Sequence, residues 1–422
     1  MRLTAEEQAI LDGQRGETLA KVMKSLVMYG DTFGAEKMVP ATGQAHLVTS
    51  FGLSVTTALF DVMDELIAAG LHAEQPFTMD PRPLDFENVP CNFLQRIVFG
   101  VMYGKQEDYE GQLRRLGLKN DKAFTCTCYM DEVGNVPARG QVLSWSESSA
   151  VVYANSVLGA RCNRNSAYMD IFGAILGRVP YFGLLTDEGR RASWVVEVKT
   201  SKRPEAQVLG SAIGLKVMED VPYIKGLAPF LGGELDDSAK AYLKDMGAAS
   251  ASNGAVGLYH VEGLTPEAVD LGDALIRPGA KTYVIDDAEL ERVKAGYPVI
   301  WKNPDAKPKL CFIGCPHLSL SQLIGWTEKL EGALQGGRLK IKTVLTAAPD
   351  VLEAFRKTPY FERLRATGAR LSYICPLMYM NNPLCKALPV ITNSNKLRTY
   401  TAARYYTDDE VTAILVKGGE GA

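Results

Sequence analysis

Residues 310–345, LCFIGCPHLSLSQLIGWTEKLEGALQGGRLKIKTVL, contain the sequence pattern that decides the fold. The apolar run at 310–313 predicts a buried strand, 319–334 predicts a helix, and 339–345 predicts a second strand. A strand, a helix and a strand in this order form a βαβ unit, whose two strands run parallel. The alternation continues on both sides, with strands expected at 256–261, 281–285, 371–374 and 388–392 and helices opening near residues 265, 287, 349 and 395. The sequence therefore predicts an α/β fold with mostly parallel sheets flanked by helices.

The length of the chain predicts more than one lobe. A chain of 422 residues exceeds what one hydrophobic core usually organises, so two or three lobes are expected. The Gly- and Ser-rich segment 246–255, MGAASASNGA, is typical of a boundary between lobes. We therefore expect an N-terminal lobe, 1–250, and a C-terminal lobe, 251–422.

Composition narrows the class of function. Hydrophobic residues make up 46% and charged residues 23% of the chain, as in an ordinary globular protein. The formal net charge of -3 offers no basic surface for nucleic acid, which favours a small-molecule substrate. No apolar run reaches the roughly 18 residues that a membrane helix needs, and the first residues do not form an apolar signal core. We therefore expect a cytoplasmic protein that binds neither nucleic acid nor membrane.

Three of the eight cysteines lie where a parallel sheet places functional groups. Cys126, Cys315 and Cys375 each come just after an apolar run that predicts a strand, and ligands of parallel sheets bind at the carboxyl ends of strands. Three thiolates can hold an iron–sulfur cluster and leave one iron open to substrate, whereas zinc also takes three cysteines and an open position. A lone cysteine is more often a small buried hydrophobic residue. The positions favour a shared metal or cluster site.

Six motifs resemble one known family. They are TCT at 125–127, GNVP at 134–137, WSESSAV at 145–151, ANSVLGAR at 154–161, GCPH at 314–317, and TNS at 392–394 followed by Lys396. Over nearly its whole length the chain resembles the large, cluster-bearing part of aconitase X. The resemblance implies an aconitase-like, multi-lobed fold and an iron–sulfur hydro-lyase. Members of that family act on cis-3-hydroxy-L-proline, which gives Δ1-pyrroline-2-carboxylate, or on 5-phosphomevalonate.

The resemblance also implies roles for individual residues. It places Cys126, Cys315 and Cys375 at the iron–sulfur cluster and gives catalytic roles to Glu147, Ser148 and His317. It assigns substrate binding to Ser50, Asp80, Pro81, Asn155, Arg161, Ser394 and Lys396. Cys128 stands where the family usually has proline, so it is either a fourth ligand or, as we favour, a residue that packs.

Several of these residues also have a structural explanation. Glu147 and Ser148 could cap the next helix, His317 could hydrogen-bond to the main chain, and Arg161 could form an ion pair. Glu147 precedes Arg161 by almost four helical turns, or about 21 Å, so it cannot neutralise the guanidinium within one straight helix. We therefore expect Arg161 to bind the substrate carboxylate, which a guanidinium can hold with two hydrogen bonds. The remaining histidines, His46, His72 and His260, lack the spacing of ligands, and we expect them to be structural.

The substrate and the partner are the least determined features. Asp80 stands where family members have a neutral amide, and an acid would repel a phosphate, so the sequence favours cis-3-hydroxy-L-proline over 5-phosphomevalonate. The family completes its site with a swivelling domain, which we expect here as a separate small subunit. An alternative of a different class is a non-catalytic iron–sulfur or redox-sensing protein that kept the fold.

Overall fold

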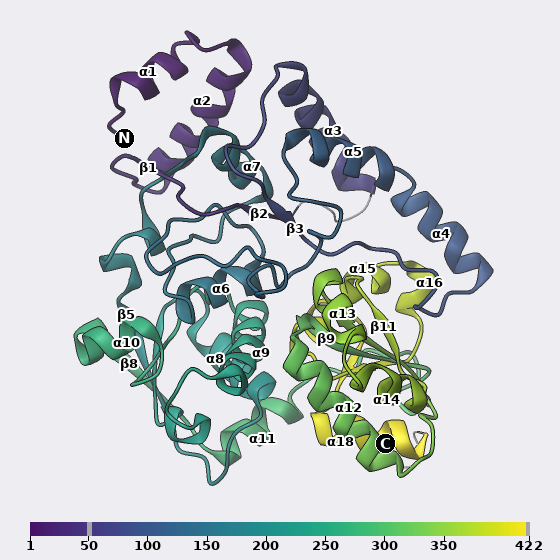
Figure 1. Ribbon diagram of the computed structural model, residues 1–422. Coiled ribbons are helices and arrows are strands. Elements are labelled where there is room, and N and C mark those ends of the chain that lie inside the picture. The colour runs from purple at the N-terminus through teal and green to yellow at the C-terminus, as the bar shows by residue number, and fades with distance from the viewer. Residues whose placement is uncertain (49–52, 419–422) are drawn as a thin grey trace.

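The computed structural model describes residues 1–48 and 53–418. Its second part is built on a parallel sheet whose strands lie within residues 192–285, and its third part on a parallel sheet whose strands lie within residues 310–405 (Figure 1). The residues before 192 form the first part. Helices pack around both sheets, so the predicted α/β fold with mostly parallel sheets is confirmed. Ser50, a predicted substrate-binding residue, lies outside the described residues.

The third part contains the predicted βαβ unit. Its five strands lie in the order β11-β10-β9-β12-β13, and every neighbouring pair is parallel. They are β9 (Leu310–Leu318), β10 (Lys342–Ala347), β11 (Arg370–Ser372), β12 (Val390–Thr392) and β13 (Arg404–Tyr405). The helices are α12 (Leu320–Leu334), α13 (Pro349–Arg356), α14 (Tyr360–Thr367), α15 (Pro376–Met380), α16 (Pro383–Lys386), α17 (Asn395–Tyr400) and α18 (Asp408–Lys417). The unit predicted from 310–345 is β9-α12-β10.

β9 runs past its predicted end at residue 313 and carries the GCPH motif. It pairs with β10 as far as Ile313, and the register then shifts before Leu318. Gly314 has a φ of 104°, and a Cβ there would lie 2.4 Å from the carbonyl oxygen of Thr346. Only glycine lets the two strands approach so closely, and this places Cys315 at the irregular point of the sheet.

The second part is a four-stranded parallel sheet in the order β7-β6-β5-β8. Its strands are β5 (Ala192–Val198), β6 (Pro222–Lys225), β7 (His260–Val261) and β8 (Ile276–Ile285). Its helices are α8 (Ala206–Val217), α9 (Asp237–Asn253), α10 (Pro266–Leu271) and α11 (Asp287–Ala295), with short 3-10 turns η1 (Gly183–Leu185), η2 (Glu188–Arg190), η3 (Ala228–Leu231) and η4 (Gly272–Leu275).

The segment 246–255 differs from its predicted role as a lobe boundary, because most of it belongs to α9. Its small residues let α9 approach α8 closely. A Cβ on Gly210 would lie 2.1 Å from the carbonyl oxygen of Met246, and one on Gly214 would lie 2.6 Å from that of Ser250. Residue 250 is therefore inside a helix, and the four-stranded sheet takes strands from both sides of it. The small residues serve helix packing, which composition alone does not distinguish from a linker.

The first part surrounds two small sheets with helices. The helices are α1 (Ala5–Leu11), α2 (Glu17–Thr32), α3 (Leu53–Ala68), α4 (Phe93–Tyr103), α5 (Gln106–Leu116), α6 (Ser148–Ser156) and α7 (Ala167–Leu176). β1 (Met38–Pro40) pairs with β4 (Arg178–Pro180) antiparallel, and β2 (His46–Leu47) pairs with β3 (Thr78–Met79) in parallel. The strand expected near Phe124 is a single bridge to Met79. None of the helices in the described part is both long and apolar enough to span a membrane.

Candidate active site

The structure brings Cys126, Cys315 and Cys375 together. Cys126 follows the Phe124 bridge of the first part, Cys315 lies in β9, and Cys375 directly precedes α15. Their exposed fractions are 8%, 7% and 8%. Burial raises the pKa of Cys375 well above its ordinary value, and Asp80, Cys315 and Cys126 add to this rise. The three thiols therefore lie within electrostatic reach of one another.

A hydrogen-bond donor points at one of these sulfur atoms, and a positive charge lies near another. The main-chain N–H of His317 donates to the Sγ of Cys126 at 3.4 Å. Burial raises the pKa of Cys315, and the positive charge of Lys396 opposes that rise. A hydrogen-bond donor and a nearby positive charge both stabilise a thiolate. Among residues 1–48 and 53–418, no three His, Cys, Asp or Glu side chains form a set that could hold a single metal ion.

Cys128 has the surroundings of a packing residue. It is fully buried and belongs to the hydrophobic core that includes Leu143 and Val151. Burial raises the pKa of its thiol well above the ordinary value, which disfavours a free thiolate at this position.

Glu147 and Lys396 form a buried ion pair beside the cysteines. Glu147 is the N-cap of α6, and its Oε2 accepts hydrogen bonds of 2.6 Å from the N–H of Ala150 and from the Ser149 hydroxyl. The Nζ of Lys396 donates to Oε1 of Glu147, and the two side chains are 8% and 6% exposed. Burial opposes both charges, but the attraction between them lowers the pKa of Glu147 and raises that of Lys396. Glu147 thus caps the helix and faces the cysteines at once.

Asp80 belongs to the same electrostatic group. It directly follows β3, and Pro81 after it is buried. Burial and the neighbouring Glu147 raise the pKa of Asp80 to about 8, while Lys396 opposes the rise. The carboxyl is therefore mostly protonated at neutral pH, and it can donate a hydrogen bond or a proton.

His317 ties together the segments that carry the three cysteines. Its Nε2 lies 3.1 Å from the carbonyl oxygen of Ile374, and its Nδ1 lies 3.0 Å from the Thr125 hydroxyl. A carbonyl can only accept, so Nε2 carries the proton and Nδ1 accepts from Thr125. Burial lowers the pKa of His317 to about 4. Both ring nitrogens have protein partners, which favours a positioning role for His317 over the catalytic role that the resemblance implied.

His46, which we expected to be structural, is a candidate that the sequence analysis missed. Its Nδ1 lies 2.9 Å from the Thr78 hydroxyl, which also accepts from Asn135 at 2.9 Å. Its Nε2 is buried and has no hydrogen-bond partner in the described part of the chain. Burial lowers the pKa of His46 to about 4, and Glu147 partly opposes this. A neutral imidazole therefore presents a free nitrogen near the ion pair. No spacing signal could reveal it, because its partners lie far along the chain.

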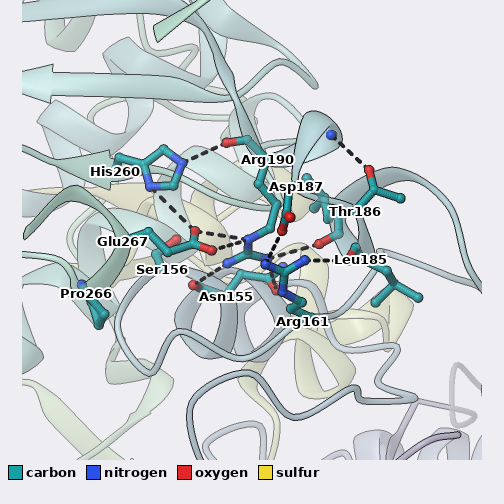
Figure 2. Close-up of polar contacts among 12 residues, drawn as sticks. Asn155, Ser156, Arg161, Leu185, Thr186, Asp187, Arg190, His260, Pro266 and Glu267 are labelled. Atoms are coloured by element: carbon teal, nitrogen blue, oxygen red, sulfur yellow. Dashed lines mark hydrogen bonds and ion pairs between the residues drawn. The ribbon is translucent and has the colours of Figure 1, made fainter. Parts of the chain in front are cut away.

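Arg161 and Asn155 lie in a different polar cluster (Figure 2). Arg161 donates to the carbonyl oxygen of Leu185 at 2.8 Å and pairs with Asp187. The Asn155 amide donates to the carbonyl oxygen of Cys162 at 2.8 Å, and its oxygen accepts from the Cys162 N–H at 2.9 Å. The expectation that Arg161 lacks a protein anion is therefore wrong, because Asp187 supplies one. Both side chains therefore have protein partners, which favours a structural role over the predicted substrate binding.

The same cluster is built around Arg190, which is almost fully buried. Its Nε donates to Glu267 at 2.7 Å, and its Nη1 donates to Asn155 at 3.2 Å (Figure 2). His260 lies 2.8 Å from the carbonyl oxygen of Arg190, so the structural role expected for this histidine agrees with its contacts.

The two predicted serines lie at helix starts. Ser148 is the first residue of α6 and is half-buried. Ser394 caps α17, where its hydroxyl accepts from the N–H of Leu397 at 3.1 Å and donates to the carbonyl oxygen of Cys315. The Ser394 hydroxyl thus joins the turn after β12 to the cysteine segment, and it positions Cys315.

Known proteins identify the family. The chain matches Aconitase X first domain over residues 1–188, Aconitase X second domain over 192–295 and Aconitase X third domain over 308–409. The chain belongs to the aconitase X family. This confirms the resemblance that the motifs indicated, and the three matched segments follow the three parts of the structure.

The relatives carry two names. A phosphomevalonate dehydratase large subunit of Thermococcus kodakarensis is 33% identical over 350 residues, which cover 82% of this chain and 81% of the relative. One of Aeropyrum pernix is 30% identical over 414 residues, covering 96% of each. A cis-3-hydroxy-L-proline dehydratase of Pseudomonas aeruginosa is 28% identical over 413 residues, covering 94% of this chain and 66% of the relative.

A solved structure confirms the aconitase-like fold. The crystal structure of Thermococcus kodakaraensis aconitase X in its holo-form superposes with a TM-score of 0.81 at 29% identity, and the match covers 99% of this chain and 100% of that one.

Proposed function

We propose that this chain is the large subunit of an aconitase X dehydratase that removes water from 5-phosphomevalonate. The observation that carries this proposal is its similarity to phosphomevalonate dehydratase large subunits, which reaches 33% identity. Those relatives are also matched over more of their own length than the hydroxyproline dehydratase, 81% and 96% against 66%. The preference for cis-3-hydroxy-L-proline in the sequence analysis is therefore reversed.

The argument from Asp80 fails for a physical reason. It assumed a charged carboxylate that would repel a phosphate. With its pKa raised to about 8, Asp80 is mostly uncharged at neutral pH, and the repulsion falls with the charge. Asp80 also lies among the thiols, whereas the phosphate of 5-phosphomevalonate is at the far end of the molecule from the carbons that react. An acid at this position therefore does not argue against a phosphorylated substrate.

We propose that Cys126, Cys315 and Cys375 hold an iron–sulfur cluster. Three buried thiols within electrostatic reach of one another, with the His317 N–H directed at the Sγ of Cys126, fit such a group. The positive charge of Lys396 would offset part of the thiolate charge. A cluster bound there would supply a Lewis-acidic iron that weakens the carbon–oxygen bond of the leaving hydroxyl.

Residues of the chain itself stabilise the developing charge and donate the proton in the dehydration. Dehydration removes a proton from C2 and the hydroxyl from C3, which leaves a double bond and one water. Lys396, held charged by Glu147, stabilises the negative charge that grows on the substrate carboxylate as the C2 proton leaves. Asp80 keeps its proton at neutral pH and gives it to the departing hydroxyl. Glu147 is a weak base while paired with Lys396, so we assign proton removal to the partner subunit.

We propose that this partner is a small subunit, because the relatives are named large subunits. We further propose a cytoplasmic enzyme. The cysteines of the described chain are all free, which suits a reducing compartment.

A substrate comparison tests the proposal. The two-subunit enzyme is co-expressed, loaded with iron and sulfide without oxygen, and given 5-phosphomevalonate or cis-3-hydroxy-L-proline. We expect loss of one water from 5-phosphomevalonate only, measured by mass spectrometry. The Cys315→Ser enzyme is the matched control without turnover. Turnover of cis-3-hydroxy-L-proline alone would restore the earlier preference, and turnover of neither by loaded enzyme would favour the non-catalytic alternative.

A further inference from the structure

Arg164 is a half-buried arginine without a protein anion. In the part of the chain that the structure describes, none of its nitrogens makes a hydrogen bond or an ion pair, and its Nη1 is buried without any partner. The two other arginines of the stretch 124–166 each have an acid, since Arg139 pairs with Asp270 and Arg161 pairs with Asp187. A buried guanidinium left unpaired is unfavourable, which indicates an anion that binds from outside the chain.

The main chain around Arg164 is fixed on both sides. The Asn163 amide donates to the carbonyl oxygen of Phe182 at 3.0 Å, and its oxygen accepts from the N–H of Leu184 at 2.8 Å. Asn165 on the other side donates to Asp170 at 3.0 Å. These contacts hold the loop in place and leave the side chain between them free. The main chain at Arg164 is therefore held in one conformation, which preorganises the side chain for a ligand.

The stem of Arg164 lies over Gly257. A Cβ at this glycine would lie 2.8 Å from Cδ1 of Leu184, 3.3 Å from Cδ of Arg164 and 3.4 Å from Cγ of Arg164. The carbonyl oxygen of Gly257 is itself held by the Asn155 amide at 2.8 Å. The glycine thus provides room for both Leu184 and the stem of Arg164.

Arg164 lies close to the candidate active site in the fold, because the Sγ of Cys162, two residues earlier, donates to the carbonyl oxygen of Trp145 at 3.7 Å, and Trp145 is two residues before Glu147. Burial lowers the pKa of Arg164, and Tyr400 and Glu147 oppose this, so both lie within its electrostatic reach. Glu147 is already engaged by Lys396, Ser149 and Ala150, and it does not neutralise a second cation. Tyr400 ends α17, the helix that carries Lys396, and is 55% exposed. Arg164 therefore lies within electrostatic reach of both the buried Glu147 and the exposed Tyr400 at the end of α17.

We infer that Arg164 binds the phosphate of the substrate and determines its specificity. The inference rests on the proposed function, since 5-phosphomevalonate carries a carboxylate next to the reacting carbons and a phosphate at its other end. Lys396 faces the first group, and Arg164 offers a guanidinium fork for the second, to which it can donate two hydrogen bonds. cis-3-Hydroxy-L-proline has no second anion for this residue. The phosphate of 5-phosphomevalonate thus pairs with the Arg164 guanidinium, which cis-3-hydroxy-L-proline would leave unpaired.

Kinetics of the loaded two-subunit enzyme test the inference. We expect Arg164→Ala to raise KM for 5-phosphomevalonate roughly tenfold to a hundredfold, as for a lost charged hydrogen bond, with unchanged iron content and a much smaller change in kcat. Arg139→Ala, which removes an exposed paired arginine from the same stretch, is the control and should leave KM unchanged. Wild-type KM in Arg164→Ala would overturn the inference while leaving the proposed function intact.

A binding measurement separates the inference from the proposed activity. Inorganic phosphate, compared with chloride at equal ionic strength, should raise the thermal midpoint of the wild-type enzyme and should not raise that of Arg164→Ala. This result would support an anion site at Arg164 even if 5-phosphomevalonate were not turned over. An equal shift in both proteins would show that phosphate binds elsewhere and would overturn the inference.

Discussion

The Nζ of Lys396 donates to Oε1 of Glu147, and this contact joins α17 of the third part to the N-terminal end of α6 in the first part. Both side chains are almost fully buried, so each charge depends on the other. The pair lies within electrostatic reach of Cys126 and Cys315, which links the packing of the two parts to the chemistry of the thiols. A substitution that removes one charge of the pair therefore leaves the other charge buried without a partner.

Lys396→Met should destabilise the protein, because it leaves the Glu147 carboxylate buried without its counter-ion. We expect a loss of about 3–5 kcal/mol in the free energy of unfolding, measured in urea. The double variant Glu147→Gln/Lys396→Met should lose less than the sum of the single variants, since neither charge remains buried alone. Additive losses would contradict a direct pair, and turnover in either variant that lacks Lys396 would contradict the role of Lys396 in catalysis.

Asp170 should make stability depend on pH. Burial raises its pKa from 3.8 to about 7, although Asn165, Ser144 and Ser146 oppose the rise by hydrogen bonding. The folded state therefore holds the proton more tightly than the unfolded chain, so its stabilising effect is complete below about pH 4 and is lost as pH rises through about 7. Asp170→Asn should be more stable than wild type at pH 8, by at most about 4 kcal/mol, and similar to it at pH 4.

The control for this prediction is Asp61→Asn, which changes an exposed acid on α3. It should leave the difference between the thermal midpoints at the two pH values unchanged. An Asp170→Asn protein with the same pH dependence as wild type would show that this carboxyl is ionised in the folded state at neutral pH.

Arg161→Lys should bind substrate as the wild type does. Its guanidinium already contacts Leu185 and Asp187, and a lysine can still reach the exposed carboxylate of Asp187. We expect KM within about twofold of wild type and a loss of stability below about 1 kcal/mol, as is common for a partly exposed pair. A KM raised tenfold or more would show that Arg161 binds the substrate after all, as the sequence analysis expected.

Cys128→Ala should retain iron and activity. The side chain is fully buried in a hydrophobic core, so its loss leaves a small cavity at a cost of about 1–2 kcal/mol. Iron and sulfide analysis of the reconstituted variant, beside the wild type, checks this. Loss of iron with an otherwise stable fold would make Cys128 a ligand.

The fold was predictable where long apolar runs alternate with amphipathic helices. α11 begins at residue 287, where a helix was predicted to open, and β9-α12-β10 follows from residues 310–345. The prediction of a lobe boundary at 246–255 was wrong because small residues occur both in linkers and in closely packed helix pairs. Only the close approach of Met246 and Ser250 to α8 shows that this segment is a packed helix. Neighbouring strands far apart in sequence cannot be assigned from a local pattern.

The site was predictable where a reactive residue directly follows a predicted strand in the sequence. Cys126, Cys315 and Cys375 were recognisable because each follows a predicted strand, and the structure places them together. Arg161 and His46 were misjudged because their environments depend on distant segments: Asp187 neutralises the first, and the fold leaves the Nε2 of the second without a partner. Charge pairing and burial are properties of the assembled fold.

The most direct test of the account is the iron content and turnover of a cysteine series in the loaded two-subunit enzyme. Cys126→Ser, Cys315→Ser and Cys375→Ser should each lose iron and dehydration of 5-phosphomevalonate together, because a hydroxyl is a poor ligand for iron in place of a thiolate. Cys311→Ser, which changes a buried cysteine earlier in β9, is the matched control and should retain both. Full iron and full turnover in any of the first three variants would contradict the shared cluster.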